Sequence, residues 1–114
     1  MKIIKLFLIT VLAISASTLF AQTTKTETIK VWGNCTTCKK NIEKAALTDG
    51  VTNAVWNKDT KYLTVTYNTA KTSNETIQKK VAAVGYDTEK YKGDDKAYNN
   101  LDECCQYNRK KEKK

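Results

Sequence analysis

The stretch VWGNCTTCKKNIEKA, residues 31–45, decides both the fold and the chemistry expected of this chain. It leads from a segment of alternating polar and apolar side chains, typical of a half-buried strand, into a segment with helical periodicity. Cys35 and Cys38 lie at this junction, at a spacing that can turn both sulfurs toward one point. A helix start with nearby lysines favours the thiolate, the form of cysteine that attacks disulfides and binds soft metals. The pair is therefore the candidate functional site.

Hydrophobic periodicity on both sides of this junction predicts six elements in the order β-α-β-β-α-β. Thr72 followed by Glu75 has the pattern of a capping box and marks the start of the second helix, which ends at Gly85. We therefore expect an α+β, ferredoxin-like βαββαβ sandwich, with two helices on one four-stranded antiparallel sheet. The predicted strands cover residues 28–32, 51–56, 62–67 and 86–91, and the first helix covers residues 37–47.

The first 21 residues have the pattern of a secretory signal peptide. Lys2 and Lys5 form a positive start, and the apolar run that follows is too short to span a bilayer as a helix. Cleavage is expected after Ala21, so we expect a periplasmic or secreted protein that does not span the membrane after processing. The rest of the chain is predicted to be a linker (22–26), one domain (27–91) and a flexible tail (92–114).

Composition narrows the chemistry further. The chain has 114 residues, four cysteines, no histidine and no proline. Without histidine, the Cys-His and Ser-His nucleophile pairs, imidazole zinc sites and histidine acid–base catalysis are excluded. The formal net charge is +8, and much of the excess lies in the basic run at residues 109–114. Because an exported protein rarely meets nucleic acid, we interpret this run as a solvated end with no nucleic-acid partner.

Three interpretations of the Cys35/Cys38 pair remain open on the residues alone. The pair can grip a soft ion of low coordination number and pass it on by thiol exchange. It can also be a thiol–disulfide redox centre, although thioredoxin-like proteins usually have a longer chain and a proline facing the active site, and this chain has none. Finally, it can form a local structural disulfide, which would close only a short loop and stabilise the fold little.

The same stretch resembles the heavy-metal-associated domain family, which includes copper chaperones, domains of metal-pumping ATPases and periplasmic mercuric-ion binding proteins. The resemblance covers about residues 25–91. It implies that Cys35 and Cys38 are metal ligands, that the ion is Cu(I) or Hg(II), with Zn or Cd as other candidates, and that the fold is the ferredoxin-like one expected above. Beyond the motif, it rests on Gly50-Val51, on LTVTY at 63–67 and on the segment from Ile77 to Tyr86.

Two aromatic residues are expected to pack near this site. By the same resemblance, Tyr86 matches a position where bacterial members carry an aromatic near the metal loop. The family commonly has methionine two positions before the first cysteine, where its side chain packs under the loop, whereas this chain has Gly33. We expect Trp32 to fill part of the volume that the missing methionine leaves.

Cys104 and Cys105, in the predicted tail, lie outside the usual domain. Three roles are open for them: further thiolate ligands to a shared metal, disulfides with Cys35/Cys38 or with another molecule, or no specific role. A disulfide between the two neighbours themselves would be strained. The intervening segment, residues 92–102, is long enough to reach back to the site.

The sequence therefore predicts an exported metallochaperone that captures a soft ion and delivers it by thiolate exchange, with no enzymatic turnover. The expected acceptor is a membrane metal transporter or another cysteine site. We expect a monomer, or a dimer bridged by the metal. A small periplasmic thiol–disulfide oxidoreductase is the alternative.

Overall fold

The second strand of the hairpin predicted after the first helix forms the centre of the sheet in the computed structural model, which describes residues 23–111. β2 (Val51–Trp56) and β3 (Tyr62–Asn68) pair antiparallel, and β1 (Thr24–Lys30) pairs antiparallel with the other edge of β3. The sheet is three-stranded, in the order β1-β3-β2. The predicted signal peptide lies outside the described residues.

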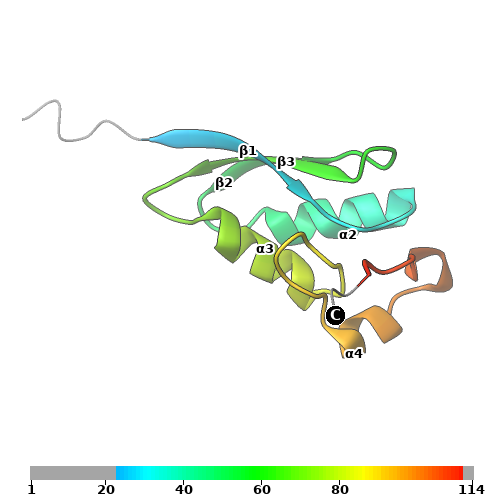
Figure 1. Cartoon of the computed structure of the whole chain (residues 1–114). Helices are drawn as coiled ribbons and strands as arrows, with labels where there is room; N and C mark the ends of the chain where they lie inside the picture. Colours follow the sequence, from blue (N-terminus) through cyan, green and yellow to red (C-terminus); the bar gives the residue numbers. More distant parts are fainter. Residues whose placement is uncertain (1–22, 112–114) are drawn as a thin grey trace, which may run out of the picture.

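Alternation along β3 fixes which face of the sheet is buried. Leu63, Val65 and Tyr67 are buried, whereas the residues between them are more exposed. Successive strand side chains point to opposite faces, so one face of the sheet carries the core and the other faces solvent. Figure 1 shows α2 (Thr36–Ala46) and α3 (Asn74–Ala83) together on one side of this sheet.

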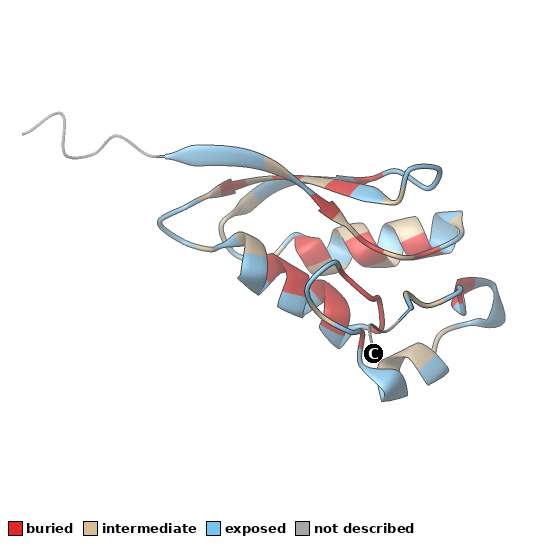
Figure 2. Ribbon diagram, in the orientation of Figure 1, coloured by how far each residue is buried: buried red, intermediate tan, exposed pale blue. Residues whose placement is uncertain are grey.

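The first helix forms where its periodicity predicts it. Cys38, Ile42 and Ala46 are buried on α2 at intervals of four residues, which places them on one face. In Figure 2 the buried positions of α2 and α3 lie toward the sheet. Cys38 is thus at once a core residue and a residue of the candidate site.

The predicted cap of the second helix is wrong by one residue. Ser73, rather than Thr72, is the N-cap of α3, and its hydroxyl oxygen accepts a hydrogen bond of 3.2 Å from the Thr76 backbone N–H. Both residue types are good N-caps, so the pattern alone does not choose between neighbours. The Thr72 hydroxyl is buried without a hydrogen-bond partner among the described residues.

The predicted fourth strand, residues 86–91, does not form as a strand. All that remains of the predicted pairing is an isolated antiparallel bridge between Val31 and Thr88, beside the free edge of β1. The chain turns back at once, because the Thr88 N–H donates to the Tyr91 carbonyl at 2.8 Å and the Tyr91 N–H donates to the Thr88 hydroxyl at 3.1 Å. A tight turn over residues 88–91 leaves no length for a ladder.

Two further boundaries differ from the prediction. β1 begins at Thr24, inside the predicted linker, because Thr24 already pairs with Asn68 of β3. The segment predicted as a flexible tail is folded onto the domain as far as residue 111, and contains α4 (Asp95–Asn99) and a 3-10 turn, η2 (Glu103–Cys105). Figure 1 shows this orange-to-red segment turning back toward the start of α2.

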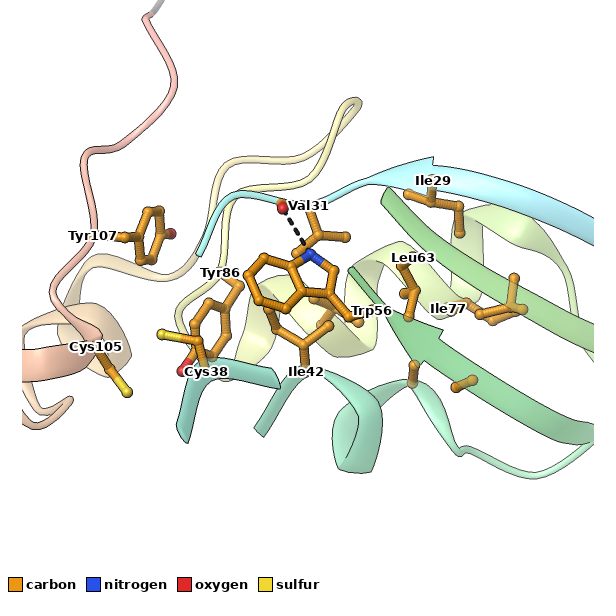
Figure 3. Packing of buried hydrophobic residues seen from close by; sticks show 14 of the residues in the cluster. Ile29, Val31, Cys38, Ile42, Trp56, Leu63, Ile77, Tyr86, Cys105 and Tyr107 are labelled. Atoms are coloured by element: carbon orange, nitrogen blue, oxygen red, sulfur yellow. Dashed lines mark hydrogen bonds between the residues drawn. The ribbon is translucent and has the colours of Figure 1, made fainter. Parts of the chain in front are cut away.

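Trp56 is the largest side chain at the centre of the core, only 1% exposed. Its indole N–H donates a 3.0 Å hydrogen bond to the Val31 carbonyl, drawn as a dashed line in Figure 3. The cluster around it runs without a break from the sheet to the C-terminal segment, since Cys105 and Tyr107 belong to it. Among residues 23–111, no helix is both long enough and apolar enough to cross a membrane.

Candidate metal centre

Three thiols from two distant parts of the chain meet at the start of α2. Cys35 Sγ lies 3.5 Å from Cys38 Sγ and 3.6 Å from Cys105 Sγ. The three sulfurs all lie within 4.8 Å of one another. Cys38 and Cys105 are buried and Cys35 is half-buried. The predicted pair is therefore brought together, and one of the two tail cysteines is added to it.

The local chain explains where the first two sulfurs point. Cys35 occupies the N-cap position of α2 in an extended conformation, and its side chain makes no capping hydrogen bond, so the thiol is left for the site. Cys38 follows in the first turn, and its thiol donates a 3.0 Å hydrogen bond to the Asn34 side-chain oxygen. Both sulfurs sit at the positive end of the helix, where thiolate is favoured.

The Cys35 and Cys105 thiols differ in acidity. Burial acts to raise the pKa of Cys35, but the polar Cys38 backbone and the neighbouring Cys38 and Cys105 thiols outweigh it and lower the pKa to about 7. Burial, together with the sulfurs of Cys38 and Cys35, raises the pKa of Cys105 far above its ordinary value. Cys35 is thus more acidic than Cys105, and an arriving metal ion would displace the proton that Cys105 retains.

Tyr86 lies beside the thiols, at the place where the resemblance puts an aromatic. It is completely buried, and its hydroxyl accepts a 3.0 Å hydrogen bond from the Asn41 side chain of α2. Figure 3 shows its ring beside Cys38, with the Tyr107 ring nearby. Burial raises the pKa of Tyr86 well above its ordinary value, so it stays a neutral phenol next to the thiols.

Trp56 fills much of the space next to Gly33, and the expected contribution of Trp32 stays a prediction. A Cβ on Gly33 would lie 3.0 Å from the Trp56 ring and 3.2 Å from Ile42 Cδ1, so Trp56 occupies that volume. Trp32 is partly buried and packs against the core cluster, and its ring lies beneath the Lys30 ammonium at 5.1 Å. Trp56 comes from β2, which is why a local reading of the loop does not find it.

Tyr107 holds the C-terminal segment against the site. Its hydroxyl donates to the Gly85 carbonyl at 2.8 Å and accepts from the Asp87 backbone N–H at 2.7 Å. Its ring stacks on Tyr86 with centroids 5.6 Å apart. Since Tyr107 is two residues from Cys105, this buried anchor fixes the third thiol in the site.

A buried ion pair fastens the same segment further along. Asp87 is 1% exposed and receives the Arg109 guanidinium through both of its oxygens, at 2.6 and 3.1 Å. The Asp87 carboxylate also accepts from the backbone N–H groups of Gly93 at 2.7 Å and Lys110 at 3.1 Å. Burial acts to raise the pKa of Asp87, but these donors outweigh it and hold the pKa below its usual value.

This ion pair predicts a pH-dependent stability. Because the pKa of Asp87 is lower in the fold than in the unfolded chain, its contribution is complete above the ordinary aspartate pKa of about 4 and is lost as pH falls through the lower folded value. Asp87→Asn should lower the thermal midpoint at neutral pH and flatten its decline in acid, as measured by circular dichroism. Asp59→Asn, an exposed change in the β2–β3 turn, controls for net charge. An unchanged acid profile in Asp87→Asn would contradict the assignment.

Tyr107, Asp87 and Arg109 are supporting residues that the sequence reading missed. A weak signal was present, because the predicted tail carries the apolar residues Tyr98, Leu101 and Tyr107. Tyr98 packs edge-on against Tyr107 with centroids 5.2 Å apart, and its hydroxyl donates to the Tyr107 carbonyl at 2.7 Å. Such scattered anchors have no helical or strand period, so pattern analysis does not register them.

Cys104, the fourth cysteine, lies at the edge of the site. Its side chain is exposed, and its Sγ is 3.9 Å from that of Cys105 but outside the three-thiol cluster. The two tail cysteines therefore differ in their surroundings, although the sequence analysis assigns them the same candidate roles. One faces inward to the site and the other faces solvent.

The spacing of the three sulfurs can be compared with the needs of a bound ion. Two thiolates about 2.3 Å from one ion lie roughly 3.8 to 4.0 Å apart in tetrahedral or trigonal geometry, and about 4.6 Å apart in linear geometry. The observed separations from Cys35, 3.5 and 3.6 Å, are close to the first range. The set is suited to a soft ion held by three sulfurs from one chain.

Comparison with known proteins agrees with this chemistry. No curated protein matches the chain. Among solved structures, the CopZ metallochaperone is 30% identical, with a TM-score of 0.54, and the match covers 56% of this chain and 98% of CopZ. Oxidized MerP from Ralstonia metallidurans CH34 is 32% identical, with a TM-score of 0.56, over 59% of this chain and 96% of MerP. A copper form of a CopA variant from Bacillus subtilis is 34% identical, with a TM-score of 0.50, over 58% of this chain and 90% of that one.

The family model leaves the C-terminal segment outside its match. The sequence model of the heavy-metal-associated domain covers residues 34–87, which contain Cys35, Cys38 and Tyr86 but neither Cys104 nor Cys105. The third thiol is thus an addition to the shared domain. On its sequence and its fold, the chain belongs to the heavy-metal-associated domain family.

Proposed function

We propose that this protein is an exported carrier of a soft metal ion, Cu(I) or Hg(II), which it binds through the thiolates of Cys35, Cys38 and Cys105. The observation that carries the proposal is the convergence of these three sulfurs within 4.8 Å at a helix N-terminus. Thiolates select soft ions over hard ones, and three of them match the low coordination numbers that Cu(I) and Hg(II) accept. The protein binds and releases its ion and carries out no enzymatic turnover.

The ion choice follows from the number of sulfurs. Structural zinc sites are usually closed by four ligands, and Cd(II) is expected to favour a similar set. The cluster offers three, and Cys104 lies outside it. Zn(II) and Cd(II) are therefore expected to bind more weakly than Cu(I) or Hg(II), although the thiolates give them some affinity.

Delivery would go by thiolate exchange to a membrane metal transporter or another cysteine site. The predicted signal peptide supports placing this exchange in the periplasm or outside the cell, with cleavage after Ala21. Because Cys105 supplies a third thiolate from the same chain, the carrier is expected to work as a monomer.

An anaerobic titration tests the proposal. The reduced protein should bind one Cu(I) per chain more tightly than free dithiothreitol does, in competition with a colorimetric chelator. Cys35→Ser and Cys38→Ser should lose this advantage, because each leaves two sulfurs. Thr36→Ser, in the same loop, is the matched control and should bind as the wild type does.

The same samples distinguish the redox alternative. If the wild type holds no ion better than dithiothreitol and instead catalyses the reduction of insulin, the protein is a thiol–disulfide oxidoreductase and the carrier proposal is wrong. Parallel titrations with Hg(II) and Zn(II) rank the ions.

A further inference from the structure

We infer that Cys104 is an exchange thiol, through which the ion passes between solvent and the three-thiol cluster. This inference rests on the proposed function and adds a role for a residue outside the binding set. It starts from a contrast between neighbours: Cys105 is 1% exposed, whereas Cys104 is exposed. A peptide bond therefore joins a buried ligand to a thiol that solvent can reach.

Such an entry has a place here because only one of the three cluster thiols, the half-buried Cys35, reaches solvent. Cys38 is completely buried, and Cys105 of η2 covers the site from the other side. Tyr107 and the Asp87–Arg109 pair hold η2 in place, so lifting the whole segment would break several buried contacts at once. A path that leaves these anchors intact costs less free energy than one that opens them.

The spacing of the two tail sulfurs provides that path. Cys104 Sγ is 3.9 Å from Cys105 Sγ, within the roughly 3.8 to 4.0 Å expected for two thiolates on one ion. An ion bound to Cys105 can therefore contact Cys104 after a small side-chain movement. Cys104 is not a resident ligand in this arrangement, because its sulfur lies outside the cluster formed with Cys35 and Cys38.

The step is a ligand exchange without redox change. As the ion leaves, the Cys104 thiol gives its proton to water and its sulfur forms a bond to the ion. The bond from the ion to Cys105 then breaks, and the Cys105 thiolate takes up a proton. The ion keeps its oxidation state, and the acceptor's thiolates displace the remaining protein sulfurs in the same way. Entry is the reverse sequence.

Cys104 is also protected from the most immediate competing reaction. Disulfides usually join cysteines whose Cα atoms are about 4.4 to 6.8 Å apart, whereas neighbours across a trans peptide are about 3.8 Å apart. The described chain has no cis peptide bond. Oxidation of Cys104 with Cys105 is therefore disfavoured, and the exposed thiol stays available for exchange.

The test measures the affinity for the ion and the rate of its release separately. The full chain, reduced and loaded with one equivalent of Cu(I), is mixed with excess chelator, and transfer is followed by stopped-flow absorbance. Cys104→Ser should keep the stoichiometry and affinity of the wild type but release the ion on the order of tenfold more slowly, because a thiol attacks far better than a hydroxyl. Glu103→Gln, at the preceding exposed position of η2, is the control and should transfer at the wild-type rate.

A second measurement identifies the free thiol directly. In the Cu(I)-loaded wild type, alkylation followed by peptide mass spectrometry should modify Cys104 and spare Cys35, Cys38 and Cys105. Wild-type transfer rates in Cys104→Ser, with binding intact, would overturn the inference and leave the carrier function standing. A loss of affinity equal to that of Cys105→Ser would also overturn it, since Cys104 would then be a ligand. Failure of the wild type to bind Cu(I) would instead overturn the proposed function itself.

Discussion

Cys105→Ser should weaken the retention of Cu(I) by at least on the order of 100-fold, because even groups that only support metal ligands are often worth 10 to 100-fold in affinity. The variant removes one of three sulfurs and leaves Cys35 and Cys38, whose separation of 3.5 Å is well short of the roughly 4.6 Å of a linear two-thiolate ion. The ion would then be held in a strained or incomplete site. Competition with a chelator series measures the loss.

The same variant should change the oligomeric state. With an open coordination position, an ion on Cys35 and Cys38 can take thiolates from a second copy, so loaded Cys105→Ser should form dimers in sedimentation experiments. The loaded wild type should remain monomeric. Cys105→Ala controls for the buried hydroxyl that serine introduces, and thermal unfolding of the metal-free variants checks that both fold. Wild-type affinity and a monomeric loaded state in Cys105→Ser would show that Cys105 is not a ligand.

The contrast between the two halves of the site shows what local patterns can predict. Cys35 and Cys38 were found because a change from strand to helix periodicity frames them, and α2, β2 and β3 follow their patterns within one residue at each end. For Cys105, the sequence leaves several roles open, and metal ligand is one of them. Its position depends on Tyr107 and Arg109 reaching Gly85 and Asp87, contacts that span more than twenty residues without any repeat.

The prediction of a fourth strand is wrong for a related reason. Tyr86, Thr88 and Tyr91 are strand-forming residue types, but the Thr88 hydroxyl closes a turn with Tyr91 and donates to the buried Gln78 side chain at 2.9 Å. Tertiary hydrogen bonds therefore override local propensity there. The result matters for the site, since ending the strand early frees Asp87 to bind the C-terminal segment and hold Cys105 over α2.

The second large effect is expected at Gly33, because Trp56 occupies the space that a side chain at this position would need. Gly33→Met restores the residue type that the family commonly carries, yet its Cβ alone would lie 3.0 Å from the indole ring. Such overpacking should cost about 1 to 3 kcal/mol. Trp56→Ala should cost about 3 to 5 kcal/mol, since it empties the centre of the core and removes the hydrogen bond to Val31.

The double variant, Gly33→Met with Trp56→Ala, should be destabilised by less than the sum of the two, with a coupling of about 0.5 to 3 kcal/mol. The methionine side chain would enter the space that the indole leaves. The φ of Gly33 is not positive, so a side chain there meets no backbone penalty and the cost is one of volume. Urea unfolding followed by far-ultraviolet circular dichroism measures all four proteins, and additive losses would show that the two positions do not share this volume. A wild-type Cu(I) affinity in the double variant would further show that, in this chain, Trp56 supports the thiol loop in the way that methionine supports it elsewhere in the family.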